Sequence, residues 1–173
     1  MTGIYPADDR IFRPWKNGGG QTAEILCWPD GAGFDDFTLR LSTARVDSSG
    51  PFSDFAGIDR VLTVIEGGPM RLCVGGQSHS LAMAQPFAFA GDLPCAAEVD
   101  APLLDFNVMT RRPLAARVWT GPLHPRARFA LLLQPYAGLR RLDLIDLQMT
   151  TPDMLRAVTG ALSVMVQLSD PKG

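Results

Sequence analysis

Hydrophobic and polar residues alternate in short stretches along most of this chain. Between Phe37 and Val46, apolar side chains occupy positions 37, 39 and 41, and polar side chains occupy the positions between them. A period of two with apolar residues on one side is typical of a β-strand with one buried face. Because glycine, proline and aspartate separate the stretches, the pattern predicts an all-β protein with little helix.

The same reasoning predicts a series of short strands. We expect them over Thr22–Trp28, Phe37–Val46, Arg60–Glu66, Met70–Val74, Gln77–Leu81, Pro86–Phe89, Cys95–Val99, Leu103–Thr110, Ala115–Trp119, Arg128–Leu133, Leu139–Leu147 and Ala161–Leu168. About a dozen short strands favour a sandwich or a barrel, because closure removes exposed strand edges.

Two local signals are more specific. Gly75-Gly76 lies between two of the predicted strands, and both glycines can adopt positive φ, which is typical of a tight hairpin. Thr151-Pro152-Asp153 combines a helix N-cap residue, a proline of the first turn and an acid near the positive end of a helix dipole. We therefore expect a short helix over Pro152–Val158.

Length and charge restrict the possible classes of protein. With 173 residues, we expect a single compact unit over 1–173, whose halves 1–112 and 113–173 share a core. Hydrophobic residues make up 46% and charged residues 20%, which excludes a disordered chain. The net charge is -2, and basic residues are scattered apart from Arg111-Arg112 and Arg140-Arg141. We therefore expect neither a nucleic acid nor a membrane as partner.

The cysteines and the apolar runs indicate a compartment. Cys27, Cys73 and Cys95 are far apart and lie in apolar stretches, as free thiols in a reducing cytosol do. The first ten residues contain Asp8 and Asp9 and no apolar segment, and no apolar run elsewhere is long enough to span a bilayer. We expect a cytoplasmic protein.

The first candidate binding segment is Arg13-Pro14-Trp15-Lys16-Asn17-Gly18-Gly19-Gly20-Gln21-Thr22. Consecutive glycines allow a sharp turn or a close approach of the backbone to another group, including a ligand. The guanidinium, indole, ammonium and carboxamide before them can together bind a carboxylate. A surface turn explains the same residues, and the pattern leaves both interpretations open.

The second candidate segment is Asp105–Arg112. On a strand, Asp105, Asn107 and Arg111 share the face opposite the apolar positions 104, 106 and 108. That polar face is either solvated or lines a cavity next to Lys16 and Asn17, and alternation cannot decide between the two.

The other polar residues give weaker signals. His79 and His124 have no second ligand at metal-binding spacing, so we expect no metal and no cofactor. Ser42 and Ser53 lack the glycines of a nucleophile elbow and are read as ordinary hydroxyls. Glu66 is either a solvated strand end or a pocket acid.

Four blocks in the right order make the chain resemble the HutD/Ves family over roughly 12–112. They are Pro14-Trp15-Lys16-Asn17-Gly18-Gly19-Gly20, Arg40-Leu41-Ser42-Thr43-Ala44, Gly50-Pro51-Phe52-Ser53 with Phe55–Arg60, and Asp105–Arg112. The resemblance implies a cupin-like β-barrel or sandwich, with two cupin-like halves in one chain, a bicupin. It also implies a bacterial accessory or regulatory protein of histidine utilisation, without an established catalytic activity.

The resemblance further implies a pocket for a small acidic metabolite such as formylglutamate. The ligand-binding residues carried over from its motifs are Trp15, Lys16, Asn17, Gly18, Thr22, Ser42, Arg60, Asn107 and Arg111. In this hypothesis Lys16 and Arg111, or Arg60, neutralise a carboxylate, while Asn17 and Asn107 orient it.

Two alternatives remain. A metal-independent cupin enzyme of isomerase or lyase type would use Lys16, Glu66 or His79 as acid or base. A non-catalytic homodimeric interaction module would use Phe52, Phe55 and Trp119 as its surface.

Overall fold

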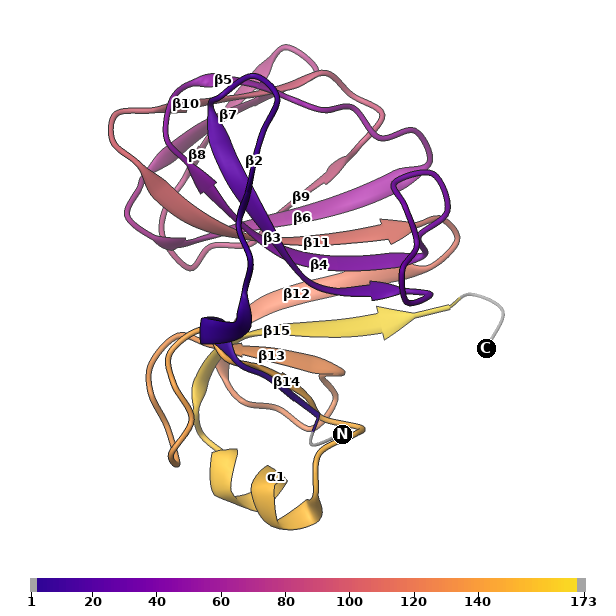
Figure 1. Cartoon of the computed structure of the whole chain (residues 1–173), viewed down its shortest axis with the longest axis vertical. Helices are drawn as coiled ribbons and strands as arrows, with labels where there is room; N and C mark the ends of the chain where they lie inside the picture. Colours follow the sequence, from indigo (N-terminus) through magenta and orange to yellow (C-terminus); the bar gives the residue numbers. More distant parts are fainter. Residues whose placement is uncertain (1–2, 171–173) are drawn as a thin grey trace.

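The computed structural model describes residues 3–170, which form fifteen strands, one short 3-10 turn and one α-helix (Figure 1). The elements are β1 Ile4–Tyr5, η1 Ala7–Asp9, β2 Arg13–Pro14, β3 Gly20–Trp28, β4 Leu39–Val46, β5 Gly50–Phe52, β6 Ile58–Glu66, β7 Met70–Val74, β8 Gln77–Leu81, β9 Phe87–Ala90, β10 Cys95–Val99, β11 Leu103–Arg111, β12 Ala115–Pro122, β13 Phe129–Leu132, β14 Leu144–Asp146, α1 Pro152–Val158 and β15 Leu162–Ser169.

The strands form three sheets, all of whose pairings are antiparallel. A six-stranded sheet has the order β2-β3-β4-β11-β6-β9, a four-stranded sheet the order β5-β10-β7-β8, and a five-stranded sheet the order β1-β14-β13-β15-β12. In Figure 1 the four-stranded sheet lies at one end of the molecule, the six-stranded sheet in the middle, and the five-stranded sheet next to α1 at the other end. We call the six-stranded sheet the central sheet.

Apolar side chains hold these layers together, because each sheet has an apolar face to bury. Leu62 and Val64 of the central sheet pack against Leu72 of the four-stranded sheet. On the opposite face of the central sheet, Phe106 belongs to the cluster that includes Phe129 of the five-stranded sheet. A third cluster lies between the five-stranded sheet and α1. The central sheet is therefore buried on both faces.

Local signals in the sequence match the structure where they depend on few residues. The hairpin is confirmed, since β7 and β8 flank Gly75 at φ 55° and Gly76 at φ 82°. The helix is also confirmed over Pro152–Val158, and the Thr151 side chain accepts a hydrogen bond from the backbone N–H of Met154. These features form because glycine permits positive φ and a threonine oxygen satisfies a free N–H at a helix start.

Other boundaries differ from the prediction. The segment Gly50–Phe52, which lies outside every predicted strand, is strand β5, paired with β10. The strand expected over Leu139–Leu147 is reduced to β14, because Leu142 has φ 69° and the Asp143 carboxylate accepts a hydrogen bond from the N–H of Arg140, which makes a turn. Tertiary pairing decided the first case, and a local turn decided the second.

The all-β class with little helix is confirmed. The closed barrel is wrong, since each of the three sheets formed by the described residues has two free ends in its strand order. The apolar faces of the sheets are buried by packing one sheet on another, and not by closing a sheet into a barrel.

No helix among residues 3–170 is long and apolar enough to cross a membrane. Met1 and Thr2, part of the N-terminal stretch in which no leader was expected, lie outside the described residues, as do positions 171–173 of the unit expected over 1–173.

Candidate functional site

Polar side chains gather on the face of the central sheet that points toward the four-stranded sheet. Strand register fixes them in rows across the sheet, since directly paired residues point to the same side. The first row is Thr22, Ala44, Asp105 and Val64, the second is Glu24, Ser42, Asn107 and Leu62, and the third contains Arg40, Met109 and Arg60. We call Ser42, Arg60, Asp105 and Asn107 the interior polar cluster, with Glu24 and Arg40 at its edge.

Arg60 is the buried cation of this cluster, with 7% of its surface exposed. Its guanidinium lies 5.8 Å from the ring centre of Phe52, 5.3 Å from that of Phe55 and 5.1 Å from that of Phe89. One Nη donates a hydrogen bond of 3.3 Å to the carbonyl of Ser53, whereas Nε has no partner among the described residues. Aromatic faces attract a cation but leave its N–H groups unsatisfied. Burial also lowers the pKa of Arg60.

Asp105 and Asn107 follow each other on the same face of β11, with 1% and 6% of their surfaces exposed. The Asn107 amide donates a hydrogen bond of 2.5 Å to Asp105 Oδ1, and both Asp105 Oδ2 and Asn107 Oδ1 remain without partners among the described residues. Burial raises the pKa of Asp105 to about 7, although the Arg60 charge, the Asn107 hydrogen bond and the backbone N–H of Ala44 oppose this. The polar face of β11 is therefore interior and not solvated.

The edge of the cluster is already paired. Arg40 donates to Glu24 over 3.0 Å and to Ser42 over 3.3 Å, and its guanidinium lies 5.0 Å from the ring centre of Phe34. Phe34 is 58% exposed and contacts Phe55, with ring centres 5.7 Å apart. The exposed ring of Phe34 thus lies next to Arg40 and contacts Phe55, which in turn lies next to Arg60.

The glycine-rich segment forms a hairpin turn between β2 and β3. The Asn17 Oδ1 atom accepts a hydrogen bond from the N–H of Gly19, and Gly18 has φ 71°. A Cβ on Gly20 would lie 2.3 Å from the carbonyl oxygen of Arg45, so only glycine fits there. The group that the glycine backbone approaches closely is therefore the backbone of Arg45 in the same protein. Lys16 is exposed on this turn.

Trp15 turns inward from the same segment. Its Nε1–H donates to Thr22 Oγ1 over 2.7 Å, and its ring meets Phe52 edge-on with centres 5.7 Å apart. Since Thr22 shares a row with Asp105, Trp15 joins the face that carries the cluster. Trp15, Thr22, Ser42, Arg60 and Asn107 therefore share one face of the central sheet.

Arg111 lies at the other end of β11, and the structure does not bring it together with Lys16. The Gly20 end of β3 is in line with Leu103, and eight strand residues at about 3.3 Å each separate Leu103 from Arg111, roughly 26 Å. Arg111 Nε donates to the Phe37 carbonyl over 2.8 Å, and Nη2 donates to the Phe34 carbonyl over 3.3 Å. Lys16 and Arg111 therefore lie at opposite ends of the sheet, and Arg111 holds the loop before β4. Their assignment to ligand binding stays a prediction.

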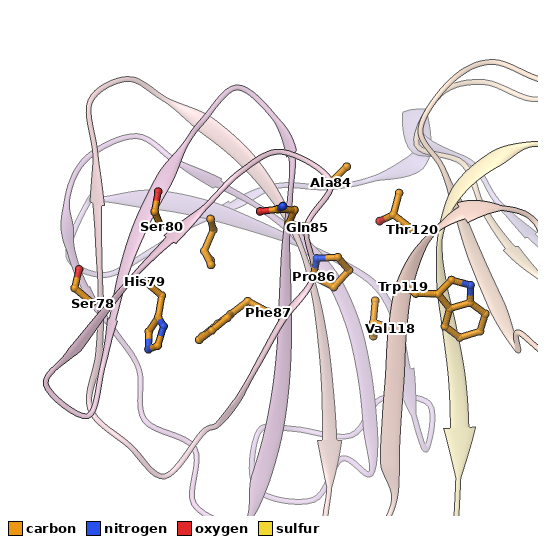
Figure 2. Close-up of a pocket in the computed structure, with 11 residues that line it drawn as sticks. Ser78, His79, Ser80, Ala84, Gln85, Pro86, Phe87, Val118, Trp119 and Thr120 are labelled. Carbon is orange, nitrogen blue, oxygen red and sulfur yellow. The ribbon is translucent and has the colours of Figure 1, made fainter.

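An open groove of about 730 Å³ lies elsewhere, between the β8–β9 connection and β12. Figure 2 shows Gln85 and Pro86 on one side of it and Val118 and Thr120 on the other. His79 also lines it, with its ring tilted against that of Phe87 and ring centres 4.6 Å apart. None of the four residues of the interior polar cluster lines this groove.

Two other candidates from the sequence occupy ordinary positions. The Glu66 carboxylate is exposed and pairs with Arg141 at 2.8 Å, so it is a strand-end surface group. No group of three or more histidine, cysteine, aspartate or glutamate residues within 3–170 is arranged to hold a metal ion.

The cluster can provide a donor, Arg60 Nε, and two acceptors, Asp105 Oδ2 and Asn107 Oδ1, in an interior with few other polar atoms. Buried polar atoms are almost always paired, so these three are suited to bind a polar molecule. Sequence reasoning included Arg60 and Asn107 among the ligand residues and omitted Asp105, Phe55 and Phe89. The alternation of β11 pointed to Asp105, but nothing local indicated the rings around Arg60.

Comparisons with known proteins agree in family and fold. The profile of the HutD family matches residues 7–132. Protein Ves of Cronobacter sakazakii is 46% identical over 101 residues, which cover 57% of this chain and 54% of that protein. An uncharacterized 21.2 kDa protein in the hutC 3′ region of Pseudomonas putida is 44% identical over 108 residues, covering 61% of this chain and 56% of that protein. The chain spans about half the length of the curated relatives it matches.

Solved structures extend the likeness to the whole chain. The structure of HutD from Pseudomonas fluorescens SBW25 matches with a TM-score of 0.77 at 30% identity, covering 96% of this chain and 97% of that one. A conserved protein of unknown function from Pseudomonas aeruginosa PAO1 matches with a TM-score of 0.71 at 34% identity, covering 96% and 91%. The three-layer arrangement of sheets is therefore shared with these proteins.

Proposed function

This chain belongs to the HutD family, and we propose on that premise that it binds a small anionic metabolite at the interior polar cluster. The observation that carries the proposal is the set of three unsatisfied buried atoms on Arg60, Asp105 and Asn107. A buried arginine without an ion pair is costly, and an anion that enters beside it removes that cost.

The position of Arg60 supports an anion rather than a neutral ligand. Phe52, Phe55 and Phe89 surround its guanidinium, and within 3–170 no carboxylate lies within ion-pair distance of it. Guanidinium groups bind carboxylates through two parallel hydrogen bonds. Asn107 and Ser42 supply the neutral polar atoms that orient the bound group, and Trp15 provides an apolar wall.

The biological role that we propose is accessory or regulatory, in histidine utilisation, in the cytoplasm. The relative from Pseudomonas putida in the hutC 3′ region and the HutD structure from Pseudomonas fluorescens support this assignment. Formylglutamate is the first ligand to test, with urocanate, formiminoglutamate, histidine and glutamate as comparison compounds. The finer fold that the resemblance implies, two cupin-like halves in one chain, belongs to the same proposal.

Thermal melting with each compound tests the proposal. A ligand at one hundred times its dissociation constant stabilises the folded state by about 2.7 kcal/mol, which raises the melting temperature by several degrees. Arg60→Met should abolish this shift, whereas Arg71→Met, an exposed arginine of β7 paired with Glu98, should leave it unchanged. If none of the five compounds raises the melting temperature of the wild type above that of the ligand-free protein, this ligand class is ruled out.

One observation favours the enzyme alternative. Asp105 is buried with a pKa raised to about 7, and such groups serve as general acids or bases in isomerases and lyases. Lys16 and Glu66 are exposed and His79 is half-buried, so Asp105 replaces them as the candidate proton carrier. Product analysis of the same five compounds separates turnover from binding.

A homodimer is a further part of the proposal. Phe52 and Phe55, which sequence reasoning assigned to a partner surface, pack against Arg60, and Trp119 lines the groove next to β12. Phe52 and Phe55 are half-buried, so part of each ring remains available for a contact between subunits. Size-exclusion chromatography with light scattering measures the mass directly.

A further inference from the structure

If the bound molecule is an anion, the buried carboxyl group of Asp105 in the interior polar cluster would repel it. Asp105 Oδ2 has no hydrogen-bond partner and no counter-ion within ion-pair distance among the described residues. Arg60 and Asp105 interact electrostatically, so a carboxylate ligand held by Arg60 adds a second negative charge near this buried carboxyl group. Two carboxylates that share one buried site repel each other strongly, and the common solution is that one of them takes up a proton.

The surroundings of Asp105 leave it as the group that takes the proton. The charged and titratable groups that interact with Arg60, Arg40 or Cys95 around the cluster include Glu24 on β3, Cys73 on β7 and Asp54 in the loop before β6. Glu24 is paired with Arg40, and burial raises the pKa of Cys95 to about 11, so that thiol stays neutral. Asp54 is exposed to solvent.

Resting on the proposed function, we propose that the cluster binds a carboxylate together with one proton, which resides on Asp105 and is donated as a hydrogen bond to the ligand. The hydrogen bonds are compatible with this, because Asn107 donates to Oδ1, whereas Oδ2 has no hydrogen-bond partner among residues 3–170 and can carry the proton. The bound carboxylate then accepts from Arg60 on one side and from Asp105 on the other. Charge-assisted hydrogen bonds of this acid–carboxylate kind are short and strong.

The state of the free protein is compatible with this mechanism. The pKa of Asp105 is raised to about 7, so above neutral pH the free protein must take up a proton when the anion binds. The affinity should therefore fall about tenfold for each pH unit above 8, where uptake approaches one proton per ligand.

Isothermal titration of glutarate into the protein at pH 8 tests the inference, because glutarate carries no hydrogen-bond donor of its own. The same titration in Tris and in HEPES, which differ in ionisation enthalpy, yields the number of protons taken up. We expect close to one proton per bound glutarate in the wild type. Asp105→Asn should bind glutarate with no proton uptake and with an affinity independent of pH, since its amide N–H replaces the acid. Glu98→Gln, an exposed acid of β10 outside the cluster, is the matched control and should keep the uptake of the wild type.

Three other results would overturn the inference, and each has a different meaning. Binding without proton uptake, together with much tighter binding of 2-hydroxyglutarate than of glutarate, means that the ligand supplies the donor. Uptake that persists in Asp105→Asn places the proton on another group. These two results leave the proposed function intact. Absence of any binding by all the anions refutes the proposed function and the inference with it. The two-buffer measurement on the wild type decides the question even if Asp105→Asn does not fold.

Discussion

Single residues in this protein matter most where a polar group is buried without a complete set of partners. Asp105 is the strongest case, because it combines nearly full burial with one unpaired oxygen. Arg60 is its cationic counterpart and is surrounded by aromatic rings rather than by carboxylates. Such unpaired buried groups destabilise the folded protein, and they are found most often at functional sites. The free energy that each one costs can be measured by mutation.

Asp105→Asn should change how stability depends on pH. Burial raises the pKa of the folded-state carboxyl from 3.8 to about 7, so between these values the folded state binds more protons than the unfolded state. The stability that Asp105 contributes is complete below pH 4 and is lost as the pH rises through 7. Relative to wild type, the variant should therefore gain on the order of 2 kcal/mol between pH 5 and pH 8.

Urea unfolding at pH 5, 6, 7 and 8 measures this gain. Glu98→Gln serves as control, because Glu98 is an exposed partner of Arg71 and such pairs contribute little. A constant difference between Asp105→Asn and wild type over this range would show that the carboxyl titrates normally in the folded protein.

At the scale of elements, the loop before β4 depends on a residue from another strand. Arg111 of β11 reaches the carbonyls of Phe37 and Phe34, and its guanidinium lies 5.4 Å from the ring centre of Phe37. The same loop carries Phe34 to the edge of the interior polar cluster. Arg111 therefore influences the candidate site through the loop and not by contact with the cluster.

Arg111→Lys should destabilise the protein by about 1–2 kcal/mol, because lysine keeps the charge but cannot donate to both carbonyls at once. The affinity for the anion should change less than twofold. Chemical denaturation and calorimetric titration provide the two quantities. Arg112→Lys is the matched control, since Arg112 is exposed and pairs with Asp59 at the surface. A large loss of affinity at unchanged stability would instead assign Arg111 to the ligand.

At the scale of the whole molecule, the central sheet connects the two ends. Its cluster face packs on the four-stranded sheet and its other face on the five-stranded sheet. Phe129 of β13 is fully buried in the second of these interfaces and contacts Trp28 of β3, with ring centres 5.7 Å apart. Arg141 adds polar contacts to Glu66 and to the carbonyl of Ile65. These contacts favour one cooperative unit.

Phe129→Ala should cost about 3–5 kcal/mol, because it removes a ring from the interface of two sheets. Unfolding should remain a single transition, observed at the same urea concentration by tryptophan fluorescence and by far-UV circular dichroism. Leu162→Ala, at a position 39% exposed, should cost much less. Two separate transitions would mean that residues 1–112 and 113–173 fold as independent parts.

Much of the fold was predictable because it depends on residues close together in the chain. Alternation located most strands, and Gly75-Gly76 and Thr151-Pro152 located the hairpin and the helix, since positive φ and N-capping are local requirements. Short strands such as Gly50–Phe52 were missed, because only pairing with β10 makes that segment extended. Of the interior polar cluster, sequence reasoning named Arg60, Ser42 and Asn107, and their role in binding stays a prediction.

The sequence by itself determined that β11 has an apolar face and a polar face and that an all-β chain results. It also placed Arg60 and Asn107 in two of the four blocks that resemble the HutD/Ves family. Only the tertiary structure decided that the polar face is interior, because β11 lies in a sheet covered on both sides. It also separated Arg111 from Lys16 and placed three aromatic rings around Arg60. The physical reason is that periodicity reports which side chains share a face, whereas burial depends on which layer packs against that face.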